Sequence, residues 1–235
     1  MTDFTFESIG GGLSVAVNDS CRVSQDGLLL ADFAAPLSSD RACDLGTGNG
    51  ILPLRWCRRE PPVHITAVER ERDPFALLCA GIEKHDLSAR ITPLCCDWND
   101  EAAMPSAHSM TLVTCNPPYF PFAGSRPSPD PVRDAARRED TPDLLARLCA
   151  SAARLLDDDG RFCLCHRPER LADVLASLRE AGLTPVKLQF VQSQEATAPW
   201  LFLCEAKRRG VLRVLPPLIT ARRGTHTAVY KRLYR

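Results

Sequence analysis

The tetrapeptide Asn116-Pro117-Pro118-Tyr119 combines residue types that could hold an aromatic amine for reaction. Such an amine is a poor nucleophile because its lone pair is delocalised into the ring, so a catalyst must hold the NH2 group with that lone pair facing the electrophile. The Asn116 side-chain oxygen and the Pro117 carbonyl could accept hydrogen bonds from its two hydrogens. Pro117 and Pro118 add no competing N–H, and Tyr119 offers a face for stacking an extruded base. We therefore predict group transfer to an amine without a general base before attack; a rigid proline turn is the alternative for these residues taken alone.

A glycine turn, Gly46-Thr47-Gly48-Asn49-Gly50, forms a second candidate site and follows Asp44 at the end of an apolar run. Glycines let a backbone approach a ligand closely, and ligands of open α/β sheets bind at the carboxyl ends of strands. Glu69 ends the next apolar run and could accept hydrogen bonds from both hydroxyls of a ribose. The turn therefore predicts a nucleoside-containing cofactor, and a tight turn without a ligand is the alternative.

The carboxylate of Asp44 separates two classes of cofactor. Dinucleotide-binding turns have the spacing G-x-G-x-x-G and face a pyrophosphate, which a carboxylate would repel. S-adenosylmethionine carries a sulfonium and an ammonium, and both suit Asp44. Asp97 follows the third apolar run, where it could accept a hydrogen bond from an adenine amino group, with Trp98 as an apolar neighbour. Capping of a following helix is the alternative for Asp97.

The elements that must position these residues alternate between short apolar runs and helical stripes from about residue 41 to residue 206, which predicts an α/β fold with a parallel sheet. Apolar residues at i, i+3, i+4 and i+7 predict core-facing helices around Phe75–Ile82, Leu145–Leu156 and Leu171–Leu178. Further helices are expected over 51–57 and over 27–35, the latter capped by Asp26. Seven strands are predicted: 42–45, 63–68, 91–95, 110–115, 161–165, 185–191 and 201–206.

Composition and charge narrow the class of protein. The 235 residues include 45% hydrophobic and 25% charged residues, as in a globular protein of one domain, and no apolar run could span a membrane. The 11 cysteines are scattered without any CxxC spacing, which favours a reducing cytoplasm and no metal site. Nine of the 29 basic residues, and no acidic one, lie in 206–235. That basic segment is either a solvated face or a phosphate-binding surface.

Two further segments follow predicted strands. Residues 117–141 form a long proline-rich and arginine-bearing stretch, and stretches of that length in compact domains are functional or disordered. His166 and Arg167 end the fifth predicted strand, so we expect them at the same sheet edge as the cofactor. A phosphate contact is expected for Arg167 and a structural role for His166.

With these motifs in place, the chain resembles the class I S-adenosylmethionine-dependent methyltransferases of the NPPY group over about residues 20 to 206. More narrowly, it is similar to the bacterial tRNA1(Val) (adenine-37-N6) methyltransferase family. The segments that carry this similarity are Val23-Ser24-Gln25-Asp26-Gly27-Leu28-Leu29-Leu30, Asn116–Phe120, His166-Arg167-Pro168 and Leu188-Gln189-Phe190-Val191.

The resemblance implies a Rossmann-like methyltransferase domain over residues 1–206, with a seven-stranded, mostly parallel sheet whose last strand is antiparallel. A basic extension, 207–235, follows this domain, and from its charges we predict that it binds the tRNA. Its activity would be N6-methylation of the adenine just 3′ of the anticodon. The implied cofactor residues are Asp26 and Gly27 of the upstream motif, Asp44, Gly46, Thr47 and Gly48 at the methionine end, Glu69 and Arg70 at the ribose, Asp97 and Trp98 at the adenine, and Asn116. The implied catalytic residues are Asn116, Pro117, Pro118 and Tyr119.

Neither the basic extension nor the stretch after Tyr119 matches a family motif, so the substrate stays open at this point. The same chemistry methylates the N2 amine of guanine in ribosomal RNA and a glutamine amide of a release factor. A non-catalytic RNA-binding module and an oxidoreductase are the remaining alternatives. The upstream and His166-Arg167-Pro168 matches favour tRNA. The scattered cysteines favour a cytoplasmic location without a metal partner, and the lack of a long apolar run favours no membrane partner.

Overall fold

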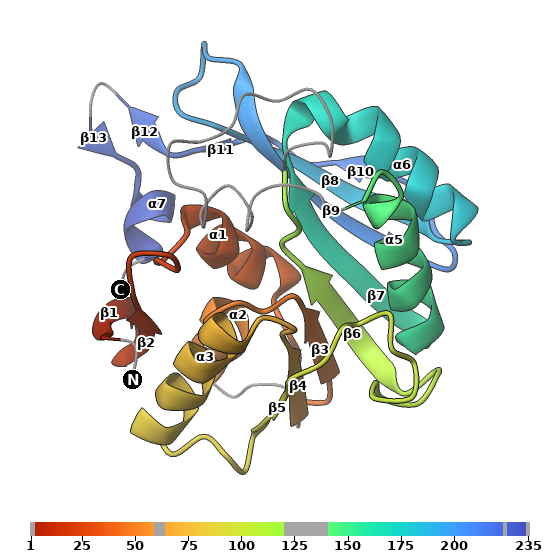
Figure 1. Ribbon diagram of the computed structural model, residues 1–235. Helices are drawn as coiled ribbons and strands as arrows, with labels where there is room; N and C mark the ends of the chain where they lie inside the picture. Colours follow the sequence, from red (N-terminus) through yellow and green to blue (C-terminus); the bar gives the residue numbers. More distant parts are fainter. Residues whose placement is uncertain (1–2, 59–63, 120–140, 223–224, 234–235) are drawn as a thin grey trace.

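A large, mostly parallel sheet forms the centre of the computed structural model, which describes residues 3–58, 64–119, 141–222 and 225–233 (Figure 1). The strand order is β10-β8-β9-β7-β6-β3-β4-β5, with β11 also paired to β8. The seven principal strands are β3 (Arg41–Leu45), β4 (His64–Val68), β5 (Ile91–Leu94), β6 (Met110–Cys115), β7 (Leu156–His166), β8 (Thr184–Gln192) and β9 (Pro199–Lys207). Strand β9 is antiparallel to both β7 and β8, so the predicted α/β class with an antiparallel last strand is confirmed.

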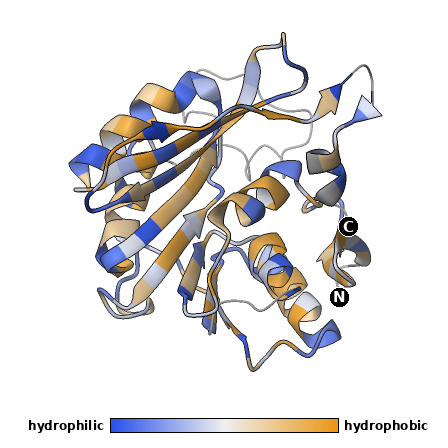
Figure 2. Ribbon diagram, turned by 180° about the vertical axis from the view of Figure 1, so that it is seen from behind, coloured by the Kyte–Doolittle hydropathy of each residue, from blue (hydrophilic) through white to orange (hydrophobic). Residues whose placement is uncertain are grey.

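Helices cover both faces of this sheet (Figure 1). Alternate strand residues point to opposite faces, so Ala42 packs in one core cluster and Cys43 in the other. One face carries α1 (Gln25–Ala34), α2 (Ile51–Trp56) and α3 (Arg72–Lys84), and the other carries α5 (Leu144–Leu155) and α6 (Leu171–Glu180), which follows the 3-10 turn η1 (Pro168–Arg170). The apolar strands between the two helical layers are visible as orange ribbons in Figure 2.

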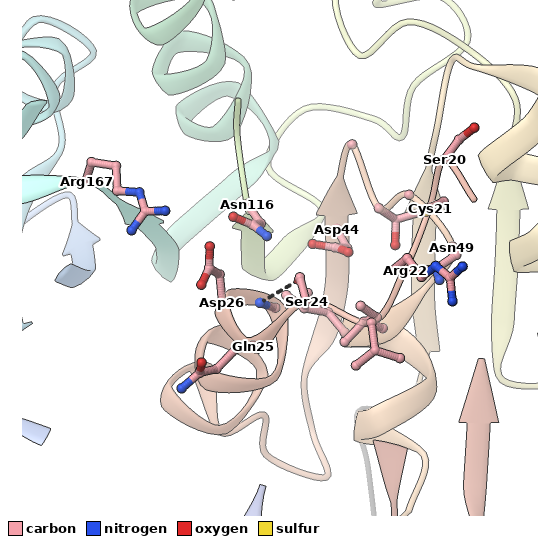
Figure 3. Close-up of a pocket in the computed structure, with 17 residues that line it drawn as sticks. Ser20, Cys21, Arg22, Ser24, Gln25, Asp26, Asp44, Asn49, Asn116 and Arg167 are labelled. Carbon is pink, nitrogen blue, oxygen red and sulfur yellow. Dashed lines mark hydrogen bonds between the residues drawn. The ribbon is translucent and has the colours of Figure 1, made fainter. Parts of the chain in front are cut away.

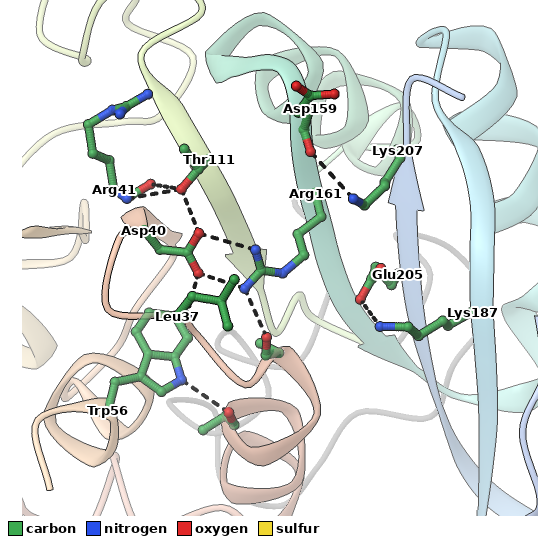
Figure 4. Close-up of polar contacts among 12 residues, drawn as sticks. Leu37, Asp40, Arg41, Trp56, Thr111, Asp159, Arg161, Lys187, Glu205 and Lys207 are labelled. Atoms are coloured by element: carbon green, nitrogen blue, oxygen red, sulfur yellow. Dashed lines mark hydrogen bonds and ion pairs between the residues drawn. The ribbon is translucent and has the colours of Figure 1, made fainter. Parts of the chain in front are cut away.

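Strand β7 is longer than the sequence predicts. It begins at Leu156, which we expected to end the preceding helical stripe, whereas the prediction started the strand at Arg161. Asp and Gly are poor strand formers, and the register with β6 shifts across the run Asp157–Gly160: Leu156 pairs with Met110, and regular pairing resumes with Arg161 opposite Leu112. Near this amino end of the sheet, Arg161 forms a buried ion pair with Asp40, at 2.7 Å (Figure 4).

The cap of α1 also differs from the prediction. Ser24, with an extended backbone, is the N-cap, and its Oγ accepts a hydrogen bond from the Gly27 N–H at 3.1 Å. Asp26 lies one residue inside the helix rather than at the cap. Its carboxylate is therefore available to the cavity described below.

Both ends of the chain add elements beyond the seven predicted strands, and of these only β10 was expected, as part of a strand-like segment over 211–215. The N-terminal hairpin consists of β1 (Thr5–Gly10) and β2 (Leu13–Val17). The C-terminal segment contains β10 (Arg213–Val214), β11 (Leu218–Ile219), the pair β12 (Ala221–Arg222) and β13 (Thr225–His226), and α7 (Ala228–Arg232). Leu233 is buried in the same core cluster as Ile9 and Leu28, so the end of the basic extension shares the core of the preceding domain.

Candidate active site

The strand register brings the predicted site residues to one edge of the sheet. Leu45 pairs with Val68 on one side and with Cys115 on the other. The residues that follow these strands, Gly46, Glu69 and Asn116, therefore lie next to one another. From β3 the chain adds strands toward β5 on one side, and from β6 it adds strands toward β7 on the other side. Open α/β sheets bind ligands at the carboxyl edge beside such a switch in strand order.

A cavity of about 540 Å³ opens at this edge (Figure 3). Its volume is within the range of small-molecule sites. Seven residues of the predicted site line it: Asp26, Gly27, Asp44, Gly46, Thr47, Gly48 and Asn116. Glu69, Arg70, Asp97, Trp98, Pro117, Pro118 and Tyr119 are not among the lining residues. Asn49 of the glycine turn and Arg167, for which we expect a phosphate contact, also line the cavity, whereas Ser20–Gln25, Ile51 and Leu52 had no predicted role in the site.

Asp44 is a buried carboxylate with one unused oxygen. Its Oδ1 accepts a hydrogen bond from Thr114 Oγ1 at 2.6 Å, while Oδ2 has no hydrogen-bond partner among the described residues. The Thr47 hydroxyl, which also lines the cavity, is buried close to this carboxylate and lowers its pKa, although among the described residues it has no hydrogen bond of normal geometry. Burial, opposed by the Thr114 hydrogen bond, raises the pKa of Asp44 to about 7. A buried acceptor of this kind is suited to a cationic ligand, which would favour its ionised form.

The glycines of the turn have different physical roles. Gly46, Gly48 and Gly50 all have positive φ angles, of 66°, 60° and 84°. A Cβ atom added to Gly46 or Gly48 would meet no protein atom within 4 Å, whereas one at Gly50 would lie 2.5 Å from Leu78 Cδ1. Gly46 and Gly48 therefore leave room for a ligand, and Gly50 is required for packing against α3.

Glu69 supports the turn as well as facing the ligand edge. Its Oε2 accepts from the Gly48 N–H at 2.9 Å and its Oε1 accepts from the Glu71 N–H at 2.8 Å. Burial raises its pKa. The backbone of Arg70 also contributes a hydrogen bond to this carboxylate. Two carboxylate oxygens can accept about four hydrogen bonds, so one further acceptance, from a ribose hydroxyl, is compatible with these three.

Asp97 and its neighbours lie further along the edge. Asp97 Oδ1 accepts hydrogen bonds from both the backbone and the side chain of Asn99, which supports the following turn. Arg70 is exposed, with its guanidinium 3.8 Å from Asp97 Oδ2, and Trp98 packs partly buried against the core under α5 and α6. Asp97 thus stabilises a turn rather than capping a helix, and the adenine contact stays a prediction.

At the other side of the cavity, the Asn116 side-chain oxygen already accepts two hydrogen bonds. One comes from the Tyr119 hydroxyl at 2.5 Å and the other from the Cys165 thiol at 3.1 Å. Tyr119 therefore points inward over Asn116, and its hydroxyl uses the acceptor that the sequence assigns to a target amine. Pro117 is buried and Pro118 is half-buried. The rest of the proline- and arginine-bearing stretch, 120–140, lies outside the described residues.

His166 and Arg167 flank Tyr119. The His166 ring is fully buried, its Nδ1 accepts from the Arg167 N–H at 2.8 Å, and burial together with Arg170 and Arg167 lowers its pKa to about 3. The Arg167 guanidinium lies 5.1 Å from the ring centre of Tyr119 and 5.8 Å from that of Trp200, and donates to the Trp200 carbonyl at 2.7 Å. Arg167 thus places a cation at the cavity (Figure 3). This cation lies near the rings of both Tyr119 and Trp200, while His166 stays neutral.

The cations of the basic extension do not form one surface. Lys207 pairs in register with Arg161 and Thr184, near the amino ends of β7 and β8, and donates to the Asp159 carbonyl at the edge opposite the cavity (Figure 4). Arg208 donates to the carbonyls of Ala153 and Leu156. After β11 pairs with the carboxyl end of β8, the exposed Arg222 and Lys231 lie on the cavity side, where α7 lies beside α1 (Figure 1). Arg223 and Arg235, and the side chain of Arg232, lie outside the described residues.

Comparisons with known proteins point to methyl transfer. Residues 24–178 match the family described as the methyltransferase small domain. The chain is 33% identical to a tRNA1(Val) (adenine(37)-N6)-methyltransferase of Porphyromonas gingivalis, covering 78% of this chain and 73% of the relative. It is 31% identical to the protein of that name in Shewanella halifaxensis, over 75% and 70% of the two chains.

Solved structures share the fold at lower identity. A protein of Agrobacterium tumefaciens described as a predicted O-methyltransferase has a TM-score of 0.70 and 21% identity, over 89% of this chain and 95% of that one. M. jannaschii TYW2 in complex with AdoMet has a TM-score of 0.60 and 13% identity, over 88% and 87%. Among the described helices, none is long and apolar enough to cross a membrane. The same residues contain no group of three or more His, Cys, Asp or Glu side chains placed to hold a metal ion.

Proposed function

The chain belongs to the methyltransferase small domain family, and from this premise we propose that it transfers a methyl group from S-adenosylmethionine to the N6 amine of adenine 37 in tRNA1(Val). Two relatives of that name, at 33% and 31% identity and each covered over more than two thirds of its length, support the substrate. The observation that carries the proposal is the meeting, at one sheet edge, of two groups: a buried Asp44 oxygen without a hydrogen-bond partner in the described part of the chain, and the amine acceptor of Asn116.

The residues around the glycine turn fit S-adenosylmethionine. When bound, this cofactor supplies an electrophilic methyl group on a sulfonium. Asp44 Oδ2 and the Thr47 hydroxyl would hold the ammonium of its methionine end, and the space beside Gly46 and Gly48 would take its backbone. Glu69 and Arg70 would lie at the ribose, where Glu69 would accept from its hydroxyls, with Asp97 further along the same edge at the adenine. Asp26 and Gly27, at the start of α1, would form part of the cavity wall around the bound cofactor.

The tetrapeptide after β6 would orient the nucleophile. The Asn116 side-chain oxygen and the Pro117 carbonyl accept the two hydrogens of the adenine N6 amine, which turns its lone pair toward the methyl group. The Tyr119 hydroxyl must leave Asn116 for this to happen, because the oxygen has two lone pairs and both are used. The released Tyr119 ring then provides a stacking face for the base, and Arg167 a cation for a neighbouring phosphate.

Methyl transfer from labelled S-adenosylmethionine to unmodified tRNA, followed by nucleoside digestion and mass spectrometry, tests the proposal. N6-methyladenosine mapped beside the anticodon is the expected product. An Asn116→Ala variant should lose turnover while S-adenosylhomocysteine still raises its melting temperature, because a ligand that binds the folded state stabilises it. A protein stabilised by S-adenosylhomocysteine that labels ribosomal RNA or a release factor, and not tRNA, would contradict the substrate and keep the cofactor.

A further inference from the structure

Cys165 belongs to neither of the motifs that define the site, yet its thiol contacts the amine acceptor. Asn116 follows Cys115, which pairs with Leu164 across β6 and β7, so the register sets Cys165 beside Asn116. The Cys165 Sγ lies 3.1 Å from Asn116 Oδ1 and 3.4 Å from the Tyr119 hydroxyl. Cys165 is fully buried, and its strand is paired on both sides.

The thiol is a donor under physiological conditions. Burial raises the pKa of Cys165 far above that of a free thiol, so the S–H proton is retained. A thiolate could accept hydrogen bonds but could not donate one to the Asn116 oxygen.

The two donors to Asn116 differ in mobility. Tyr119 lies at the half-buried end of the Asn116–Tyr119 turn and must give up its bond when an amine takes its place. Cys165 is held within a central strand and keeps its position. Once the Tyr119 hydroxyl has released Asn116, the Cys165 thiol still donates to the Asn116 oxygen. This bond keeps the oxygen of the Asn116 amide, rather than its NH2 group, facing the thiol.

The orientation of that amide decides whether a target amine can bind. With Oδ1 toward the thiol and the amine, Asn116 accepts; with the amide turned by 180°, its own NH2 would face the amine and two donor groups would oppose each other. We propose that Cys165 is a positioning residue for amine methylation, holding the Asn116 side chain with its oxygen toward the substrate. This inference rests on the proposed function for its substrate, and on the described contacts for its geometry.

A neighbouring cysteine provides a matched control. Cys163 lies two residues earlier on β7, is fully buried in the same core cluster, and has no hydrogen bond to Asn116 among the described contacts. Alanine at either position removes the same buried thiol, so any shared loss of stability reports on packing. A difference between the two variants reports on the contact with Asn116.

The experiment compares Cys165→Ala, Cys165→Ser and Cys163→Ala in steady-state methylation of tRNA. A single neutral hydrogen bond contributes about 0.5–1.5 kcal/mol, so Cys165→Ala should lower kcat about 2- to 12-fold with the KM for S-adenosylmethionine unchanged. Cys165→Ser keeps a donor and should recover most of the loss, while Cys163→Ala should keep the wild-type kcat. Wild-type kcat in Cys165→Ala, or equal losses in both alanine variants, would overturn the proposal.

A second measurement needs no turnover. The side-chain amide NMR signals of Asn116, identified by their absence in Asn116→Ala, should shift in Cys165→Ala and stay in place in Cys163→Ala. If the wild-type protein methylates no tRNA, the substrate proposal fails, and these signals still decide the role of Cys165. Unshifted Asn116 signals in Cys165→Ala would refute that role even in an active enzyme.

Discussion

At the scale of single residues, the raised pKa of Asp44 predicts that ligand binding at the glycine turn depends on pH. Its pKa is raised to about 7 by burial, so half of the free protein carries a protonated Asp44 near neutrality. A cationic cofactor favours the carboxylate, and protonation must therefore oppose binding. We predict that the dissociation constant for S-adenosylmethionine rises as pH falls from about 7.5 to about 5.5, approaching a tenfold change per pH unit. Calorimetric titrations across this range measure the effect, and a constant affinity would contradict it.

The raised pKa of Asp44 also predicts that the charged form, which binds a cationic cofactor, lowers the stability of the free protein. Because its folded pKa lies above that of an unfolded Asp, its contribution to folding is favourable at low pH and is lost as pH rises from about 4 through about 7. At pH 8 the charged, buried Asp44 destabilises the free protein. Asp44→Asn keeps an oxygen for Thr114 and should melt at a higher temperature than wild type at about pH 8, with a smaller difference near pH 5.

Ligand binding supplies the control for that variant. Asp44→Asn should lose the stabilisation by S-adenosylhomocysteine, since an amide cannot replace the carboxylate opposite an ammonium. A variant that melts below wild type at both pH values would show that Asp44 contributes to folding in its charged form.

The sequence identified the site residues whose chemistry is visible from type and spacing. Asp44, Gly46, Gly48 and Asn116 line the cavity as expected. Cys165 could not be found this way, because a cysteine in an apolar strand resembles any small core residue until the strand pairing is known. The inward position of Tyr119 was equally hidden, since it depends on the side chains of a neighbouring strand.

At the scale of elements, one buried arginine joins three parts of the chain. Arg55 of α2 is bound by both oxygens of Asp32 in α1, at 2.9 Å each. Its Nη1 donates to the carbonyls of Ile9, in the N-terminal hairpin, and Leu233, after α7, at 2.6 and 2.7 Å. These four bonds connect the two ends of the chain to the helix layer that lines the cavity.

Loss of this arginine should be costly. Arg55→Met leaves two buried carbonyls without their donor, and removal of one partner from a buried charged network costs about 3–5 kcal/mol, less here because Asp32 is about one third exposed. We expect urea unfolding to show a loss of about 2–4 kcal/mol. Arg222→Met, which breaks an exposed pair with Glu195, should change stability by less than about 1 kcal/mol. Equal effects of the two substitutions would rule out the structural role of Arg55.

Periodicity predicted the seven strands because each is an apolar run flanked by helical stripes, and β6 agrees at both ends. It missed the start of β7, where an acidic run lies between two residues that pair with β6, Leu156 and Arg161. It also missed β1 and β2, whose pairing depends on a turn at Gly11 and Gly12 and whose inner residues, such as Val15 and Val17, pack on a domain that follows in the chain.

At the scale of the whole molecule, the fold divides the positive charge of residues 207–235 between opposite ends of the sheet. Lys207, Arg208 and Arg209 follow β9 at the amino end, close to the acidic run Asp157–Asp159. Arg222 and Lys231 lie beyond β11 on the side of the cavity. The predicted tRNA surface, the whole of residues 207–235, must therefore be narrowed. An RNA held with its base at Asn116 reaches the cavity side of the sheet more readily than the opposite end.

Truncation at residue 206 is a poor test of that surface, since Leu233 is buried and its carbonyl binds Arg55. Matched pairs of exposed cations avoid this difficulty. Arg222→Gln with Lys231→Gln, on the cavity side, should weaken tRNA binding and lower the slope of log affinity against log salt by about 1 to 2, because each lost phosphate contact removes about 0.7–0.9 of slope. Arg209→Gln with Arg213→Gln, at the other end, removes the same formal charge and should leave both quantities close to wild type. Fluorescence anisotropy over a range of salt concentrations measures tRNA binding by the two double variants. Equal losses would mean that the electrostatic field of the whole protein attracts the RNA. A loss confined to the cavity-side pair would mean that the RNA backbone lies along α7 and β12 as the target base enters the site.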